Sequence, residues 1–127
     1  MTKANKILIV EDEPAMLNVL AVKLTQAGLT VITAGNGQEG LDVALAQHPD
    51  LILLDIIMPV MDGMTMLREL RKDSWGRSAK VVLLTNLSEA GKADESFEQG
   101  VYDYLVKSDW KLEDIVNKVK GKLGITT

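Results

Sequence analysis

Five short runs of branched or leucine-rich residues alternate with longer segments in which apolar residues recur every three or four positions. The short runs are Lys6–Val10, Thr30–Ala34, Leu51–Leu54, Lys80–Leu84 and Tyr102–Val106. Three of them are almost wholly apolar, which is typical of parallel strands buried on both faces. The longer segments predict helices over Pro14–Ala27, Gln38–Gln47, Met64–Lys72, Ser88–Gln99 and Lys111–Leu123. We therefore expect strand and helix to alternate five times.

This alternation predicts an α/β fold, a doubly wound, flavodoxin-like (βα)5 sandwich with helices on both faces of a five-stranded parallel sheet. Polar residues follow four of the five strands: Glu11 and Asp12, Asp55, Thr85, and Lys107. The second strand ends at Ala34–Gly35 without such a residue. Strand order 2-1-3-4-5 puts that strand at an edge and makes strands 1 and 3 neighbours, whereas order 3-2-1-4-5 would separate their acids. We therefore expect the order 2-1-3-4-5.

Length and charge restrict the class of protein. The chain has 127 residues and a formal net charge of −4, which predicts a single domain over residues 1–127 with no separate output domain. Without a basic block, direct binding of nucleic acid is not expected. No apolar run approaches membrane-spanning length and no leader precedes the first strand, so we expect a cytoplasmic protein that does not contact the membrane. The absence of cysteine excludes disulfides and thiolate metal sites.

The polar strand ends indicate phosphoryl chemistry, because the carboxyl ends of parallel strands share one edge of the sheet. Three carboxylates brought together there repel one another unless a cation joins them, and oxygen ligands of this kind suit Mg²⁺. A carboxylate can also accept a phosphoryl group, whose charge the metal, Lys107 and Thr85 would stabilise. Each residue also has a simpler reading: acids near Pro14 can cap a helix, Asp55 or Thr85 can form a turn or cap, and Lys107 can be a solvated surface lysine.

The sequence resembles the receiver domain of two-component response regulators, the CheY-like family. The resemblance covers essentially the whole chain and is carried by four motifs: VEDE at Val10–Glu13, LLDIIMPVMDG at Leu53–Gly63, LLT at Leu83–Thr85 and YLVK at Tyr104–Lys107. It implies that Asp55 accepts a phosphoryl group from a histidine kinase or a histidine phosphotransfer protein. It also implies a Mg²⁺ cofactor, with Mn²⁺ as a substitute. Its ligands would be Asp12, Asp55, the Ile57 backbone carbonyl and, mainly through water, Glu11.

The same resemblance implies a phosphorylation-activated switch that controls a downstream protein which the sequence does not name. Lys107 would pair with the phosphoryl group, while Thr85 turns toward it and the switch aromatic Tyr104 moves inward. The catalysis implied is limited to self-catalysed phosphoryl transfer and autodephosphorylation, so whether the chain counts as an enzyme is left open. The segment Ser88–Gln99 has a narrow apolar stripe, and we expect the surface of this fourth helix, the fifth strand and the fifth helix to change on phosphorylation.

Four positions depart from the family pattern. Asn86 stands where the family usually has a smaller residue, and Ile57 and Leu87 are apolar at positions that affect how water reaches the acyl phosphate. Ser108 replaces the usual proline after Lys107. The lifetime of the phosphorylated state and the geometry of the Lys107–Ser108 peptide are therefore left open.

Two alternative functions belong to other classes. The first is a pseudo-receiver, a protein-interaction module that keeps the fold and signals without phosphate. The second is a dinucleotide-binding domain, because Gly35–Gly40 satisfies the pattern G-x-G-x-x-G after a strand and before a helix. A local explanation of that motif is that Asn36 caps the helix and Glu39 completes a capping box.

Three further features are expected to be structural. His48, the only histidine, precedes Pro49 and is predicted to be a solvated turn residue. The methionines that follow Asp55 are predicted to serve as adaptable packing. Trp75 lies on a connection, and the sequence does not decide whether it is buried.

Overall fold

The computed structural model describes residues 5–56, 58–85, 104–106 and 111–124. Five strands form one parallel sheet in the order β2-β1-β3-β4-β5, so the predicted fold class and strand order are confirmed. The strands are β1 (Lys6–Val10), β2 (Thr30–Ala34), β3 (Leu51–Asp55), β4 (Val81–Thr85) and β5 (Tyr104–Val106). Three strand ends differ from prediction by one residue: β3 includes Asp55, and β4 begins at Val81 and includes Thr85. At the carboxyl ends of β3 and β4 the ladder extends to a polar residue that the apolar pattern could not include.

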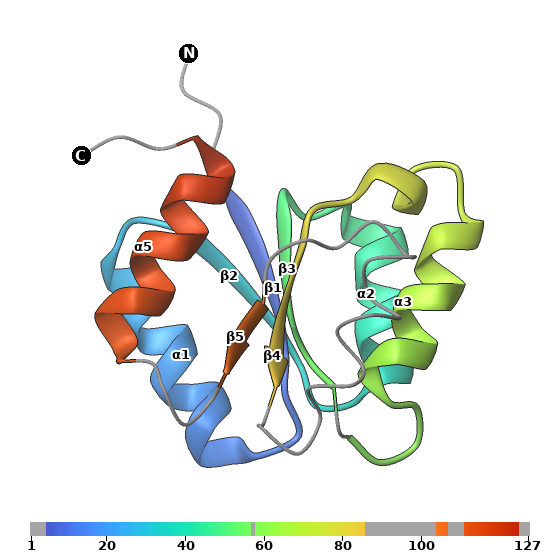
Figure 1. Ribbon diagram of the computed structural model, residues 1–127, viewed down its shortest axis with the longest axis horizontal. Coiled ribbons are helices and arrows are strands. Elements are labelled where there is room, and N and C mark those ends of the chain that lie inside the picture. The colour runs from blue at the N-terminus through green and yellow to red at the C-terminus, as the bar shows by residue number, and fades with distance from the viewer. Residues whose placement is uncertain (1–4, 57, 86–103, 107–110, 125–127) are drawn as a thin grey trace.

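Helices cover both faces of the sheet. Figure 1 shows α1 and α5 on one side and α2 and α3 on the other. The helices are α1 (Pro14–Gln26), α2 (Gly37–Gln47), α3 (Gly63–Lys72), the short 3₁₀ helix η1 (Gly76–Ser78) and α5 (Leu112–Leu123). The predicted helix Ser88–Gln99 lies outside the described residues. Within the part of the chain that the structure describes, no helix is both long and apolar enough to cross a membrane.

Alternate residues of the central strands pack into two separate cores, one on each face of the sheet. One core combines Leu8, Val10, Ile52, Leu54 and Leu83 with apolar residues of α2 and α3. The other combines Ile7, Ile9, Leu51, Leu53, Val82 and Leu84 with residues of α1 and α5. Because both sets are buried, the central strands contain almost no polar residue until their carboxyl ends. Polar side chains of the central strands therefore gather at the carboxyl edge of the sheet.

The two ends of α1 follow from its sequence. Pro14 occupies the first helical turn, where its missing N–H costs nothing. Gly28 adopts a φ of 95° just past the last turn, and its N–H donates to the Thr25 carbonyl at 3.0 Å. The helix therefore ends where a residue that tolerates the left-handed region is available.

Side-chain caps begin α2 and α3. The Glu39 N–H donates to Asn36 Oδ1 at 2.9 Å, and the Thr65 N–H donates to Asp62 Oδ1 at 2.8 Å. The Glu39 carboxylate accepts a longer bond of 3.4 Å from the Gly35 N–H. The predicted Asn36 cap of α2 is therefore confirmed, whereas the Glu39 carboxylate bonds to the residue before the cap and so does not close a regular capping box.

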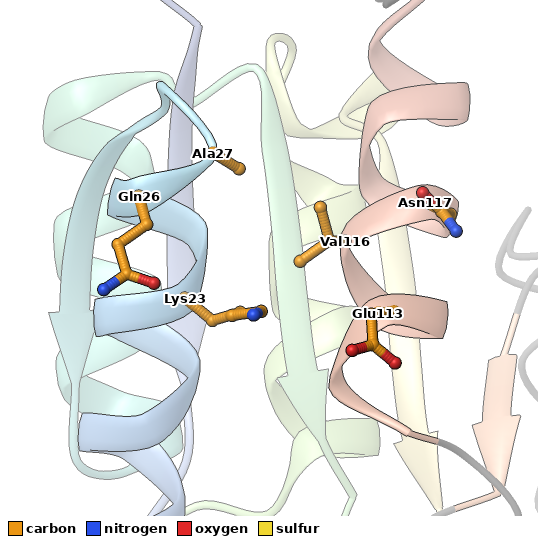
Figure 2. A pocket seen from close by; sticks show the side chains of 6 residues that line it. All are labelled: Lys23, Gln26, Ala27, Glu113, Val116 and Asn117. Atoms are coloured by element: carbon orange, nitrogen blue, oxygen red, sulfur yellow. The ribbon is translucent and has the colours of Figure 1, made fainter.

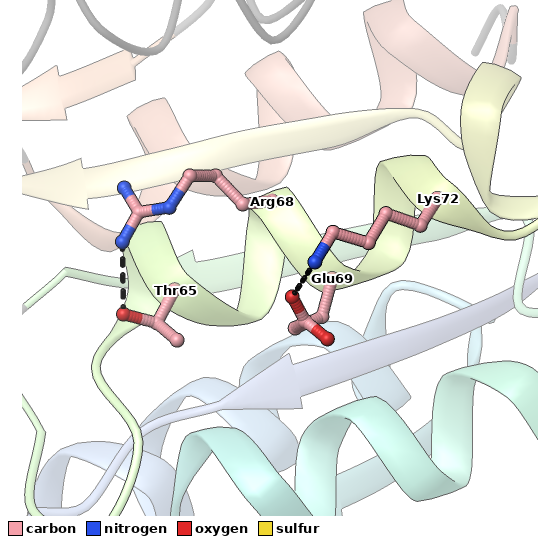
Figure 3. A network of polar contacts seen from close by, with 4 residues as sticks. All are labelled: Thr65, Arg68, Glu69 and Lys72. Atoms are coloured by element: carbon pink, nitrogen blue, oxygen red, sulfur yellow. Dashed lines mark hydrogen bonds and ion pairs between the residues drawn. The ribbon is translucent and has the colours of Figure 1, made fainter.

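The outer face of α3 is polar. Arg68 donates to Thr65 Oγ1 at 3.1 Å, and Lys72 pairs with Glu69 at 2.6 Å (Figure 3). Both pairs are exposed and three residues apart, so each stabilises the helix by no more than a few tenths of a kcal/mol, on the order of 0.2–0.5. The inner face of α3 contributes Met64, Met66, Leu67 and Leu70 to the core.

Three structural expectations can be judged here. Met58, Met64 and Met66 are buried in the core against α2 and α3, and Met61 packs against it, so the packing role of the methionines is confirmed. His48 is exposed as predicted, but it also ends α2 with a φ of 48°. Its ring stacks on that of half-buried Trp75, with centroids 4.3 Å apart and planes within 5°.

Candidate functional site

Two acids, Glu11 and Asp12, follow the carboxyl end of β1 and lie at one edge of the sheet. Glu11 follows Val10 directly and is only 1% exposed, whereas Asp12 is exposed. The Glu11 N–H donates to the Ala34 carbonyl at 3.1 Å, which continues the pairing of β1 with β2 by one residue. The backbone at Glu11 is therefore still held by the sheet, and the chain turns away only at Asp12.

Asp55 reaches the same place from β3. The register pairs Val10 with Leu54, so the next residues along the two neighbouring strands are Glu11 and Asp55. Asp55 is 3% exposed and is paired with Leu84 of β4 on its other side. Its position is thus determined by a strand buried between two others.

The carboxylate oxygens of Glu11, Asp12 and Asp55 converge. One oxygen of each lies within 4.8 Å of the others, although the three come from two strands about 44 residues apart in the sequence. Carboxylates this close repel, and a divalent cation relieves that repulsion while using their oxygens as ligands. The donor set is oxygen only, which fits Mg²⁺ or Mn²⁺ better than a softer metal. The residues present therefore fit the predicted cofactor.

The remaining predicted site residues are described only in part. β4 ends at Thr85, which pairs with Val106, and β5 contains Tyr104, so the Thr85 backbone lies in the strand next to β3 and the Tyr104 backbone one strand further along the sheet. Lys107 and Ile57, with its backbone carbonyl, lie outside the described residues, as do Asn86, Leu87 and Ser108. Their assigned roles and the consequences drawn from them stay predictions.

The simpler reading of the β1 acids as helix caps finds no support in the described part of α1. Glu13 is the residue that precedes the helix, and its side chain makes no capping hydrogen bond there. The nearby acids Glu11 and Asp12 instead point into the cluster with Asp55.

Gly63 is a site residue that the hydrophobic pattern did not identify. A Cβ atom at this position would lie 2.2 Å from the Asp55 backbone oxygen, and the Gly63 N–H donates to the Ile56 carbonyl at 2.7 Å. The first turn of α3 therefore packs directly against the backbone of Asp55. The sequence signal was the glycine after Asp62, but what it contacts depends on how α3 folds back on β3.

A groove between α1 and α5 lies apart from the acidic cluster. Figure 2 shows its lining, and its volume is about 280 Å³. It is lined by Lys23, Gln26, Ala27, Glu113, Val116 and Asn117. None of these residues belongs to the cluster, so the groove does not extend the site.

A family profile decides the identity of the fold. The profile described as the response regulator receiver domain matches residues 7–120. The chain belongs to this family. It is a receiver domain of the kind found in two-component response regulators, and the resemblance seen in the sequence is confirmed.

Curated relatives contain the receiver domain as part of longer proteins. The chain is 34% identical over 118 residues to the DNA-binding dual master transcriptional regulator RpaA of Synechocystis, covering 93% of this chain and 48% of that protein. It is 41% identical over 102 residues to the probable transcriptional regulator ycf27 of Pyropia yezoensis, covering 80% and 41%. The chain therefore spans less than half the length of these relatives.

Solved structures of receiver domains share the fold. The chemotaxis protein CheY4 of Vibrio cholerae matches with a TM-score of 0.86 at 28% identity, covering 94% of this chain and 98% of that one. The receiver domain of a sensor histidine kinase from Pseudomonas aeruginosa matches with a TM-score of 0.85 at 30% identity, covering 96% and 99%. The latter structure holds a magnesium ion in its active-site cleft.

Proposed function

We propose that this receiver domain is a phosphorylation-activated signalling switch in which Asp55 accepts the phosphoryl group. The observation that carries the proposal is the convergence of the Glu11, Asp12 and Asp55 carboxylates within 4.8 Å at the carboxyl edge of the sheet. Asp55 lies at the centre of this edge because β3 is flanked by β1 and β4. In open α/β sheets this edge is where ligands bind.

In the proposed reaction a carboxylate oxygen of Asp55 forms a bond to phosphorus while the bond from phosphorus to the donor breaks. The donor is a phosphohistidine of a histidine kinase or of a histidine phosphotransfer protein, which leaves as the unphosphorylated imidazole. Mg²⁺, with Mn²⁺ as a substitute, would be held by Asp12, Asp55 and the Ile57 carbonyl, with Glu11 acting through water. It would neutralise the charge that gathers on the phosphoryl oxygens.

The proposal gives Lys107, Thr85 and Tyr104 the roles expected from the family. Lys107 pairs with the phosphoryl group, Thr85 turns its hydroxyl toward it, and Tyr104 moves inward to complete the change. The surface of the fourth helix, β5 and α5 then controls a downstream protein. We further propose that this takes place in the cytoplasm, with no membrane or nucleic acid bound by this chain itself.

The test is phosphorylation by a small donor. We expect the protein to gain one phosphoryl group, measured on the intact mass, when it is incubated with Mg²⁺ and acetyl phosphate. Asp55→Asn should abolish the gain, because an amide oxygen is not a competent nucleophile here. Asp42→Asn, which alters an exposed acid on α2, should leave it intact. Removal of Mg²⁺ with a chelator should also prevent it.

Two outcomes would contradict the proposal. A chain that gains no phosphoryl group from acetyl phosphate or from any phosphohistidine donor would instead be a pseudo-receiver. A gain that persists in Asp55→Asn would place the acceptor elsewhere.

A further inference from the structure

The glycine-rich turn Gly35–Gly40 has no part in the proposed chemistry. It follows β2, the edge strand of the sheet, and it supplies no residue to the carboxylate cluster. Two of its glycines are nevertheless buried and in tight contact with the segments that carry the acids. Protein atoms therefore fill the space beside Gly37 and Gly40.

Gly37 contacts the connection between β3 and α3. Its N–H donates to the Met61 carbonyl at 3.1 Å. A Cβ atom at residue 37 would lie 2.1 Å from that same oxygen and 2.9 Å from the carbonyl carbon. The two backbones therefore touch, and any side chain at residue 37 would push the connection away.

Gly40, one turn further along α2, contacts the other acidic segment. Its Cβ would lie 2.8 and 2.9 Å from the two methyl groups of Val10 and 3.1 Å from Met66 Sδ. Val10 immediately precedes Glu11. The first turn of α2 thus packs between the end of β1 and the connection that follows Asp55. These two segments adjoin the three carboxylates of the cluster.

Two backbone hydrogen bonds hold the described part of the connection after Asp55. The Met61 N–H donates to the Pro59 carbonyl at 2.8 Å, so the chain is tightly turned at Val60. Two residues after Met61, the Gly63 N–H donates to the Ile56 carbonyl at 2.7 Å, and Gly63 packs against the Asp55 backbone oxygen. A shift of the Met61 carbonyl would therefore also disturb the segment that packs on the backbone of Asp55.

We propose that Gly37 is a positioning residue for phosphoryl transfer. By holding the Met61 carbonyl against the first turn of α2, it fixes the connection that packs, through Gly63, on the backbone of Asp55. This inference rests on the proposed function, because the reaction it tunes is phosphorylation of Asp55.

The principal test is Gly37→Ala. The α2 helix is already held at Gly40 by Val10 and Met66, so the added methyl group displaces the Met61 carbonyl by roughly 1 Å, a misplacement that can cost about 100-fold in rate. We expect the maximal rate of phosphorylation by acetyl phosphate at saturating Mg²⁺ to fall by about 10- to 100-fold. The donor concentration that gives half the maximal rate should change little, since Gly37 does not contact the donor site.

Gly121→Ala is the matched control. It makes the same change of glycine to alanine within a helix, at a position where a Cβ atom meets no described atom within 4 Å. It should leave the maximal rate within about twofold of wild type. If the Gly37→Ala rate matches that of Gly121→Ala, the inference is overturned.

A second pair of variants decides the matter if Gly37→Ala does not fold. Asn36→Ala removes the cap that orders the first turn of α2 without adding any atom near Met61, and Asn36→Ser retains a capping oxygen. We expect the maximal rate to fall about threefold or more in Asn36→Ala and to be restored in Asn36→Ser. An unchanged rate in Asn36→Ala would overturn the inference.

The failure of this inference is distinguishable from failure of the proposed function. If wild-type protein is never phosphorylated, the proposed function fails, and the Mg²⁺ affinity measured by calorimetry becomes the readout. A dissociation constant for Mg²⁺ raised about fivefold or more in Gly37→Ala over Gly121→Ala then supports a role of Gly37 in positioning the carboxylates. Equal dissociation constants in the two variants overturn it.

Discussion

At the scale of single residues, Val60 has an unfavourable backbone conformation for its type. It is β-branched, has a φ of 70° and is 83% exposed. The left-handed region costs a non-glycine residue roughly 1–2 kcal/mol, whereas Asn tolerates it better. No burial of the side chain offsets this cost, so the conformation is imposed by the hydrogen bonds of Met61 and Gly63 around it.

Val60→Asn should therefore stabilise the protein. We expect the free energy of unfolding, measured by urea denaturation, to rise by about 1 kcal/mol. Val22→Asn is the matched control, because Val22 is 56% exposed and lies in α1 with helical geometry. It should change the free energy by less than about 0.5 kcal/mol. Equal effects at the two positions would show that Val60 is not strained.

At the scale of elements, one arginine joins α3 to the connection that leads to β4. Arg71 Nη1 donates to the Gly76 carbonyl at 2.6 Å and to the Ala79 carbonyl at 2.9 Å. Partial burial lowers the pKa of the Arg71 guanidinium from its usual value, which reflects the cost of removing the charge from water. The two carbonyls compensate for that cost and close the turn after α3.

Removing this guanidinium should be costly. We expect Arg71→Met to lower the free energy of unfolding by about 2–3 kcal/mol, since it deletes charged hydrogen bonds to partly buried carbonyls. Arg68→Met, one turn earlier on the exposed face of α3, should cost less than about 0.5 kcal/mol. Thermal or urea unfolding of the two variants would check this, and similar losses would contradict a special role for Arg71.

At the scale of the whole molecule, folding itself creates the acidic site. The chain carries a net charge of −4, and three of its carboxylates are brought together only when β1 and β3 pair. A cation that binds this cluster binds the folded chain and not the unfolded one. Its binding free energy therefore adds to the stability of the fold.

Mg²⁺ should therefore stabilise the protein against unfolding. At a concentration 100 times its dissociation constant, we expect a gain of about 2.7 kcal/mol in the free energy of unfolding, measured at matched ionic strength. Asp12→Asn should reduce this gain by weakening the binding of Mg²⁺, while Asp42→Asn should preserve it. A gain of the same size in Asp12→Asn would mean that Mg²⁺ acts at another place.

Most of the fold and three of the site residues were predictable from the sequence. The apolar runs predicted the strands to within about one residue at their described ends. The strand order could be chosen because the second strand, unlike the others, is not followed by a polar residue. Glu11, Asp12 and Asp55 were predictable as a cluster because parallel strands end at a common edge. The exposure of Leu45 on α2 was not predictable, because the width of a helix's buried face depends on the neighbouring helix.

The sequence by itself determined the alternation of strand and helix, the cap at Asn36, and the edge at which the acids gather, because each depends on local periodicity or chain direction. Only the tertiary structure decided that Gly37 meets the Met61 carbonyl and that His48 stacks on Trp75. It also decided that Val60 lies in the left-handed region. The first two features arise where segments far apart in the chain pack together, and the third where the chain turns back from β3 to α3. Their geometry depends on how whole helices pack on the sheet, which no local pattern contains.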